Sequence, residues 1–181
     1  MKIIFEQEEH DTLFFIDAEY EFERVIQFSG IIFTKIKTGV YDLMGSFNLY
    51  INDNGGLSNF TQAFTGISPN FIASYGIPYP DLNHFWRDLI SNYRDILIVA
   101  HNMKGDCNVL FKNGVNLDKF DHYDTYNMAK KYWPNEISFK VFDLAAAQGY
   151  FSYSPHDSFS DAWGLVPIFA ALKEREAQSG K

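Results

Sequence analysis

The sequence predicts an α/β fold in which helices flank a mixed sheet, made of a three-stranded antiparallel meander plus parallel strands. Two observations carry this prediction. The first half of the chain holds three apolar segments joined by short turns, which is typical of neighbouring antiparallel strands. The second half alternates segments of helical periodicity with short apolar runs, which is typical of parallel strands connected by helices.

The expected meander consists of residues 13–18, 24–35 and 39–51, which are rich in Phe, Ile, Val and Leu. Turn-forming residues separate or end these strands. Lys37-Thr38-Gly39 lies between the second and the third, and a run of Asn, Asp and Gly over residues 52–56 ends the third.

The second half begins with a helix over residues 82–94, where Leu82, Phe85 and Leu89 recur at helical spacing. The β-branched run 96–100 predicts a buried strand, and residues 120–124 predict a shorter one. The other expected helices cover residues 104–112, 125–132, 139–148 (closed by Gly149) and 157–176.

Length and composition favour one packed domain. The chain has 181 residues, 46% of them apolar, so we expect a single domain over residues 1–181 with a core from about 13 to 172. Nearly all of the aromatic residues are expected in that core. The N-terminus lacks signal-peptide features, no apolar run is long enough to span a bilayer, and Cys107 is the single cysteine. We therefore expect a cytoplasmic protein without a membrane partner.

Net charge limits the partners. At −8, the chain lacks the basic balance typical of proteins that hold long nucleic acid by its phosphates. The objection weakens if several acids are metal ligands, because two bound divalent cations would offset half of this charge. We expect weak binding to long nucleic acid, and the acidic balance favours short or single-stranded substrates.

Two carboxylates follow the first apolar run. Asp17 and Glu19 are two residues apart, so on a strand both side chains leave the same face of the sheet. Carboxylates this close repel one another unless a cation lies between them, and a divalent ion with oxygen ligands suits the pair. Taken alone, the motif is more often the start of a solvated loop.

Two later segments add polar groups. The strand that ends at Ala100 is followed by His101, Asn102 and Asp106, and the carboxyl ends of strands are where α/β sheets place ligands. Asp106 falls in the first turn of the next helix, where it could also stabilise the helix N-terminus. We expect His101 to be structural.

The last expected helix opens with His156, Asp157 and Asp161. Asp157 suits the N-cap of that helix. His156 and Asp161 lie five residues apart across the junction of loop and helix, so the histidine can stand near the carboxylate without sharing its metal.

In this order, D-x-E, H-N-x-x-x-D and H-x-x-x-x-D resemble the DEDDh exonuclease family, which includes the proofreading subunits of bacterial replicative polymerases and RNase T. The resemblance runs from about Leu13 to Leu172, with secondary matches at Thr65-Gly66-Ile67 and Asp124-Thr125. It implies an RNase H-like fold. It also implies a 3′→5′ exonuclease that hydrolyses phosphodiester bonds at nucleic-acid 3′ ends and releases nucleoside monophosphates.

The resemblance implies roles for single residues. Two divalent metal ions, Mg²⁺ or Mn²⁺, would be held by four carboxylates: Asp17, Glu19, Asp106 and Asp161. His156 would act as the general base or orient the attacking water. The substrate, a single-stranded or frayed 3′ end of DNA or RNA, would contact Ala18, Tyr20, Phe22, Thr65, Gly66, Asn102 and His156. A polymerase or other replication protein is an expected partner.

The chain departs from the family pattern at three places. Tyr20-Glu21-Phe22-Glu23 replaces the Thr-Thr-Gly that often follows the first motif, Gly105 replaces a common Phe before Asp106, and Ser158 replaces a usual Ala. None of these removes a proposed ligand or the base, so the chemistry is retained while substrate preference stays open.

Two alternatives remain at this point. The enzyme could be an RNA-trimming exoribonuclease or an oligoribonuclease. The chain could also be a catalytically silent RNase H-like module that binds a partner, although a silent module has little need to keep four converging acids.

Overall fold

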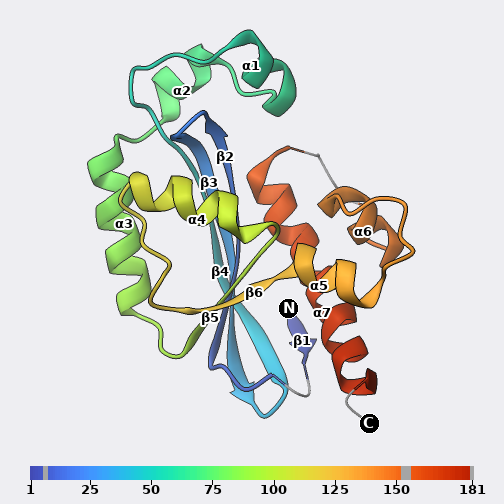
Figure 1. Ribbon diagram of the computed structural model, residues 1–181. Helices are drawn as coiled ribbons and strands as arrows, with labels where there is room; N and C mark the ends of the chain where they lie inside the picture. The colour runs from blue at the N-terminus through green and yellow to red at the C-terminus, as the bar shows by residue number, and fades with distance from the viewer. Residues whose placement is uncertain (6–7, 152–155, 180–181) are drawn as a thin grey trace.

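A mixed sheet runs through the centre of the molecule (Figure 1). The computed structural model describes residues 1–5, 8–151 and 156–179, and within them six strands pair in the order β1-β4-β3-β2-β5-β6. The strands are β1 (Lys2–Ile4), β2 (Thr12–Glu21), β3 (Arg24–Lys37), β4 (Val40–Tyr50), β5 (Ile96–Ala100) and β6 (Asp121–Asp124).

The pairing confirms the predicted meander. Strands β2, β3 and β4 are antiparallel neighbours, and β5 and β6 continue the sheet in parallel beside β2. Strand β1, which the sequence analysis did not predict, adds an edge by pairing antiparallel with β4, with Lys2 opposite Asp42. Three residues are too few for an alternating pattern to be read, so this strand is defined by its partner.

Helices cover both faces of the sheet. In Figure 1, α3 and α4 lie on one side of the strands, and α5, α6 and α7 lie on the other. The helices are α3 (Tyr79–Ser91), α4 (Met103–Lys112), α5 (Thr125–Tyr132), α6 (Val141–Ala147) and α7 (Ser158–Ser179). Each of the expected helices is present, with ends shifted by a few residues. Gly149 follows α6 at φ 81°, as a residue that closes a helix should.

Two short helices were not predicted. Helix α1 (Asn59–Thr65) and helix α2 (Pro69–Tyr75) lie beyond the end of the sheet where β2 ends (Figure 1). Their sequences begin with cap signals, because the Ser58 and Ser68 side chains accept hydrogen bonds from backbone N–H groups three residues on. Helices of seven residues give too little periodicity to be recognised from the apolar pattern.

The alternation along β2 decides which face of the sheet receives the acids. Leu13 and Phe15 pack in the core with α5, α6 and α7, whereas Phe14 and Ile16 pack in the core with α3 and α4. Asp17 continues the first series, so its carboxylate leaves the sheet on the side of α7. The strand continues through Glu21, which places the acidic pair within β2, further from its end than expected.

This mixed sheet with helices on both faces is the RNase H-like α/β fold that the sequence predicts. Among the described residues, no helix combines the length and apolarity needed to cross a membrane.

Candidate active site

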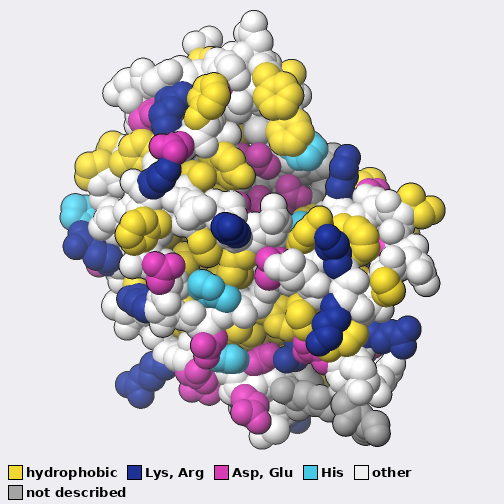
Figure 2. All heavy atoms as spheres, viewed as in Figure 1, with side chains coloured by type: hydrophobic (Ala, Val, Ile, Leu, Met, Phe, Trp, Pro, Cys, Tyr) yellow, Lys and Arg dark blue, Asp and Glu magenta, His cyan; other side chains and the backbone are white. Residues whose placement is uncertain are grey.

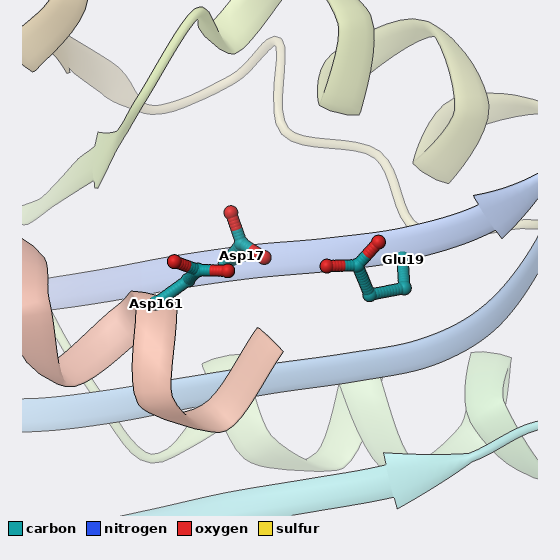
Figure 3. Close-up of side chains that lie close together, drawn as sticks. All are labelled: Asp17, Glu19 and Asp161. Atoms are coloured by element: carbon teal, nitrogen blue, oxygen red, sulfur yellow. The ribbon is translucent and has the colours of Figure 1, made fainter. Parts of the chain in front are cut away.

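Strand β2 and helix α7 bring three carboxylates together. Asp17 and Glu19 project from β2, and Asp161 projects toward them from the first turn of α7 (Figure 3). One carboxylate oxygen from each lies within 4.8 Å of the other two. Residues separated by more than 140 positions therefore form one acidic cluster, which local sequence alone does not require.

Helix α4 supplies the fourth acid. Asp106 lies in the first turn of α4, as predicted, and lines the same cavity as the other three, although it is outside their tight cluster. Its Oδ2 atom is buried and has no hydrogen-bond partner among the described residues. A buried carboxylate oxygen without a donor is costly, so this atom is suited to a cation as its partner.

Burial raises the pKa of all four carboxyls, and repulsion by neighbouring acids adds to this effect at Asp17, Glu19 and Asp106. Burial, followed by the charges of Asp161 and Asp157, raises the pKa of Glu19 from 4.5 to about 8. Burial raises the pKa of Asp161 to about 7, against the hydrogen bond from the His156 backbone N–H, which lowers it. Burial and neighbouring acids also raise the pKa of Asp17 and Asp106 well above the usual range.

No lysine or arginine in the described part of the chain forms an ion pair with any of these four acids. Four carboxylates without a basic partner make an oxygen donor set that suits hard divalent cations such as Mg²⁺ and Mn²⁺. The residues present therefore fit the metal ions that the sequence resemblance implies.

A buried polar network fixes the start of α7. Asp157 accepts a hydrogen bond from the Ser160 N–H at 3.1 Å, which is the expected N-cap geometry. Its other carboxylate oxygen accepts from Gln27 Nε2 at 2.7 Å, and Gln27 Oε1 accepts from the Ser158 N–H at 3.2 Å. Strand β3 thus holds the first turn of α7, and with it Asp161.

We expect Gln27→Leu to lower the free energy of unfolding by about 1–3 kcal/mol, because it leaves the buried Ser158 N–H without its acceptor and removes a donor from the half-buried Asp157 carboxylate. Gln27 is fully buried, whereas Gln178 near the end of α7 is exposed. Urea unfolding of both Gln→Leu variants would check this, with Gln178→Leu within about 0.5 kcal/mol of wild type. Equal stability of the two would contradict the role of the network.

The acids form part of the floor of an open cavity of about 610 Å³. Figure 2 shows this hollow, with acidic side chains inside it and hydrophobic and histidine side chains at its rim. Most of the predicted substrate residues line it: Ala18, Tyr20, Thr65, Asn102 and His156. Two do not. The Phe22 side chain is 84% exposed and is not part of the cavity wall, and Gly66 caps the end of α1 at φ 73°.

The two histidines of the cavity differ in how they are held. His101 Nε2 lies 2.7 Å from the carbonyl of Phe139, which only accepts, so this nitrogen carries a proton; Nδ1 lies 2.9 Å from Thr125 Oγ1. These contacts connect β5 to α5 and to the segment before α6, in keeping with the structural role expected. His156, by contrast, stands at the cavity wall with its ring against Phe64.

Several residues of the cavity wall are not among the site residues that the sequence predicts. They include three residues of α1 and four at the start of α6: Phe60, Thr61, Phe64, Lys140, Val141, Phe142 and Asp143. Nearly all aromatic residues were expected in the core, and this is wrong for Phe60, which is 75% exposed, and for Phe22. The spacing of Phe60 and Phe64 at i and i+4 was the available signal, since it places both rings on one helical face.

Two of the departures from the family pattern have a structural reason. A Cβ atom at Gly105 would lie 3.3 Å from the Tyr20 hydroxyl, so a large side chain at position 105 would displace Tyr20. The absence of a side chain at Gly105 therefore leaves room for the Tyr20 hydroxyl. The Ser158 hydroxyl is fully buried and lies 2.6 Å from Ser29 Oγ, which satisfies both groups between α7 and β3.

The fold and the site together define an RNase H-like α/β protein with an acidic, candidate metal centre. By sequence, the chain matches neither a protein-family model nor a curated protein. Solved structures do match. The nuclease domain of 3′hExo, described as a DEDDh family member bound to rAMP, is 16% identical with a TM-score of 0.68, over 94% of each chain.

Two further structures agree with this likeness. E. coli Exonuclease I in complex with a dA16 oligonucleotide is 18% identical with a TM-score of 0.72, over 93% of this chain and 42% of that one. Exonuclease X in complex with 5′ overhanging duplex DNA is 18% identical with a TM-score of 0.58, over 94% and 93%. The chain thus spans less than half of Exonuclease I. The fold is that of DEDDh exonuclease domains.

Proposed function

We propose that this chain is a metal-dependent 3′→5′ exonuclease that removes nucleoside monophosphates from nucleic-acid 3′ ends, and that residues 1–181 form one exonuclease domain. The observation that carries the proposal is the convergence of four carboxylates, none of them ion-paired with a described lysine or arginine, in an open cavity that also holds a histidine. The structural likeness to DEDDh exonuclease domains supports it.

The carboxylates of Asp17, Glu19, Asp106 and Asp161 would hold two divalent ions, Mg²⁺ or Mn²⁺. When bound, these ions would supply the positive charge that activates water and stabilises the phosphoryl group under attack. The protein's own contribution is to keep the four acids in place from β2, α4 and α7. Because the folded core holds these three elements together, the acids are already in position when the substrate binds.

His156 would take the proton from the attacking water as the P–O3′ bond breaks. Burial lowers the pKa of this imidazole, with a further contribution from the charge of Lys140, so that the ring is neutral and able to accept a proton at neutral pH. Its backbone N–H is bonded to Asp161, which keeps it beside the acids.

We expect His156→Gln to lower kcat by about 10²–10⁴-fold, the usual scale for a lost general base, while Mn²⁺ affinity stays within about twofold of wild type. Steady-state kinetics and calorimetric titration with Mn²⁺ would measure the two effects separately. A parallel loss of metal affinity would show that the histidine is a ligand. His84→Gln, on α3 and outside the cavity, is the matched control.

The walls of the cavity favour an unpaired 3′ end. Phe60 presents its ring to solvent on one side, and Lys140 is the one lysine or arginine among the described residues that line the cavity. Bases stack on aromatic rings and phosphates pair with lysine. A flexible single strand can therefore place a base on Phe60 and a phosphate beside Lys140 at the same time. The neighbours named above were solved with rAMP, with an oligonucleotide and with overhanging duplex DNA.

Cytoplasmic location and a polymerase or other replication partner are further parts of the proposal. The single cysteine supports the first and the sequence resemblance supports the second.

A gel assay tests the function directly. 5′-labelled single-stranded DNA and RNA of one sequence would be incubated with Mg²⁺, Mn²⁺ or a chelator. A ladder that shortens from the 3′ end only with metal supports the proposal, and the faster substrate identifies the nucleic acid. Absence of any ladder, together with no heat of Mn²⁺ binding, would instead indicate the catalytically silent module.

A further inference from the structure

The imidazole of His156 is held in an unusual way. Its ring centroid lies 3.7 Å from that of Phe64, with 31° between the two planes. The structure gives the imidazole no hydrogen bond to another described residue, whereas both ring nitrogens of His101 are hydrogen-bonded. The orientation of a histidine is ordinarily set by a hydrogen bond to its second nitrogen. At His156, the contact with the Phe64 ring replaces such a hydrogen bond.

Phe64 belongs to a stack of three rings. Phe60 lies one helical turn before it on α1, at 5.7 Å between centroids and 14° between planes. Phe64 therefore contacts two rings, those of Phe60 and His156. It is 44% exposed, while Phe60 is 75% exposed and leaves an outer face open to solvent. The inner ring contacts the histidine and the outer ring is free to meet a base.

The helix that carries this stack is anchored to the strand that carries the acids. The Ser58 N–H, at the N-cap of α1, donates to Glu21 Oε2 at 2.9 Å, and Glu21 is a buried residue of β2. Asp17 and Glu19 lie on the same strand. The position of Phe64 relative to the acids is thus fixed through α1, while the His156 backbone N–H is fixed through Asp161.

We propose that Phe64 is a positioning residue for His156: in contact with the imidazole, it holds the ring at the wall of the acidic cavity in the orientation needed to take a proton from water. This rests on the proposed function, in which His156 is the base. Phe60, with its outer face open, has the separate task of stacking on a base of the substrate. Two phenylalanines one turn apart thus control kcat and KM respectively.

Kinetics separate the two rings. Phe64→Leu removes the ring and keeps an apolar side chain, and we expect kcat to fall by about 10–10²-fold with KM nearly unchanged, the scale for a misplaced catalytic group. Phe64→Tyr keeps the ring and should restore kcat. Phe60→Leu should raise KM by about fivefold or more, because stacking on a base is lost. Phe111→Leu, an exposed phenylalanine of α4 outside the cavity, is the control.

A second readout needs neither metal nor substrate. The ring current of Phe64 should shift the imidazole proton resonances of His156 upfield, and His156→Gln identifies them among the five histidines. Phe64→Leu should move these resonances downfield, and Phe111→Leu should not.

The inference is overturned if Phe64→Leu raises KM while kcat is kept, or if the His156 resonances do not move. Failure of the proposed function looks different, because wild type then shows no metal-dependent ladder. In that case the resonance shift still decides whether Phe64 holds the imidazole.

Discussion

Replacing Asp17 by Asn should lower the rate of hydrolysis by more than about 10²-fold. Loss of a residue that only hydrogen-bonds to a metal ligand typically lowers metal affinity or activity by about 10–100-fold, and loss of a ligand itself should have a larger effect. Asp17 faces Asp161, Asp106 and Glu19, whose charges raise its pKa beyond the effect of burial. The Asn side chain keeps the shape of the carboxylic acid and cannot supply the anionic oxygen that a divalent cation requires.

The same substitution should make the metal-free protein more stable. In the folded chain without metal, the Asp17 carboxyl either takes up a proton or repels its neighbours, and an amide does neither. Relief of about 1 kcal/mol would raise Tm by roughly 2–4 °C in a chain of this size. Asp88→Asn, an exposed acid of α3, is the control. A variant with near-normal turnover would show that Asp17 is not a ligand.

Metal binding should offset the loss of stability that the metal-free protein shows as pH rises. A carboxyl whose folded pKa is raised, such as Glu19 at about 8, binds more protons in the folded than in the unfolded state. Its contribution to stability is therefore full below its unfolded pKa near 4.5 and falls as pH rises to about 8. Asp161, with a pKa of about 7, acts in the same direction.

Excess Mg²⁺ should remove this loss, because the ions bind the deprotonated carboxylates and so bind better as pH rises. Thermal melts from pH 5.5 to 9, with chelator or with Mg²⁺, would measure the effect as a gain in Tm that is larger at pH 8.5 than at pH 6. The difference between wild type and Glu19→Gln isolates the contribution of Glu19 from that of other titrating groups. A gain in Tm that did not depend on pH would contradict the assignment of the acids as the binding site.

The main elements of the fold could be predicted because their signals are local. The apolar runs that became β2, β3 and β5 and the helical spacing of α3 are properties of short stretches of sequence. The elements that were missed depend on partners or caps. Strand β1 exists through its pairing with β4, and α1 and α2 are marked by Ser58 and Ser68 instead of by apolar periodicity.

The acids of the site could be named from their order and context, but the cavity wall could not. The packing of Phe64 against His156 joins segments that are 92 positions apart, and nothing in either segment indicates the other. Likewise, the pairing of Tyr20 with Gly105 is visible only once α4 lies over β2. Burial is a property of the whole fold, so an exposed phenylalanine and a core phenylalanine cannot be distinguished by residue type alone.

The route by which the acids are assembled has a consequence for the growing polypeptide. Asp17 and Glu19 belong to β2, whereas His156 lies just before α7 and Asp161 in its first turn, so both are synthesised well after the first strands. A chain interrupted before residue 156 would lack both the proposed proton acceptor and one of the four carboxylates. The proposed nuclease activity would therefore require the segment around α7, and chains interrupted before it would not cut the nucleic acid around them.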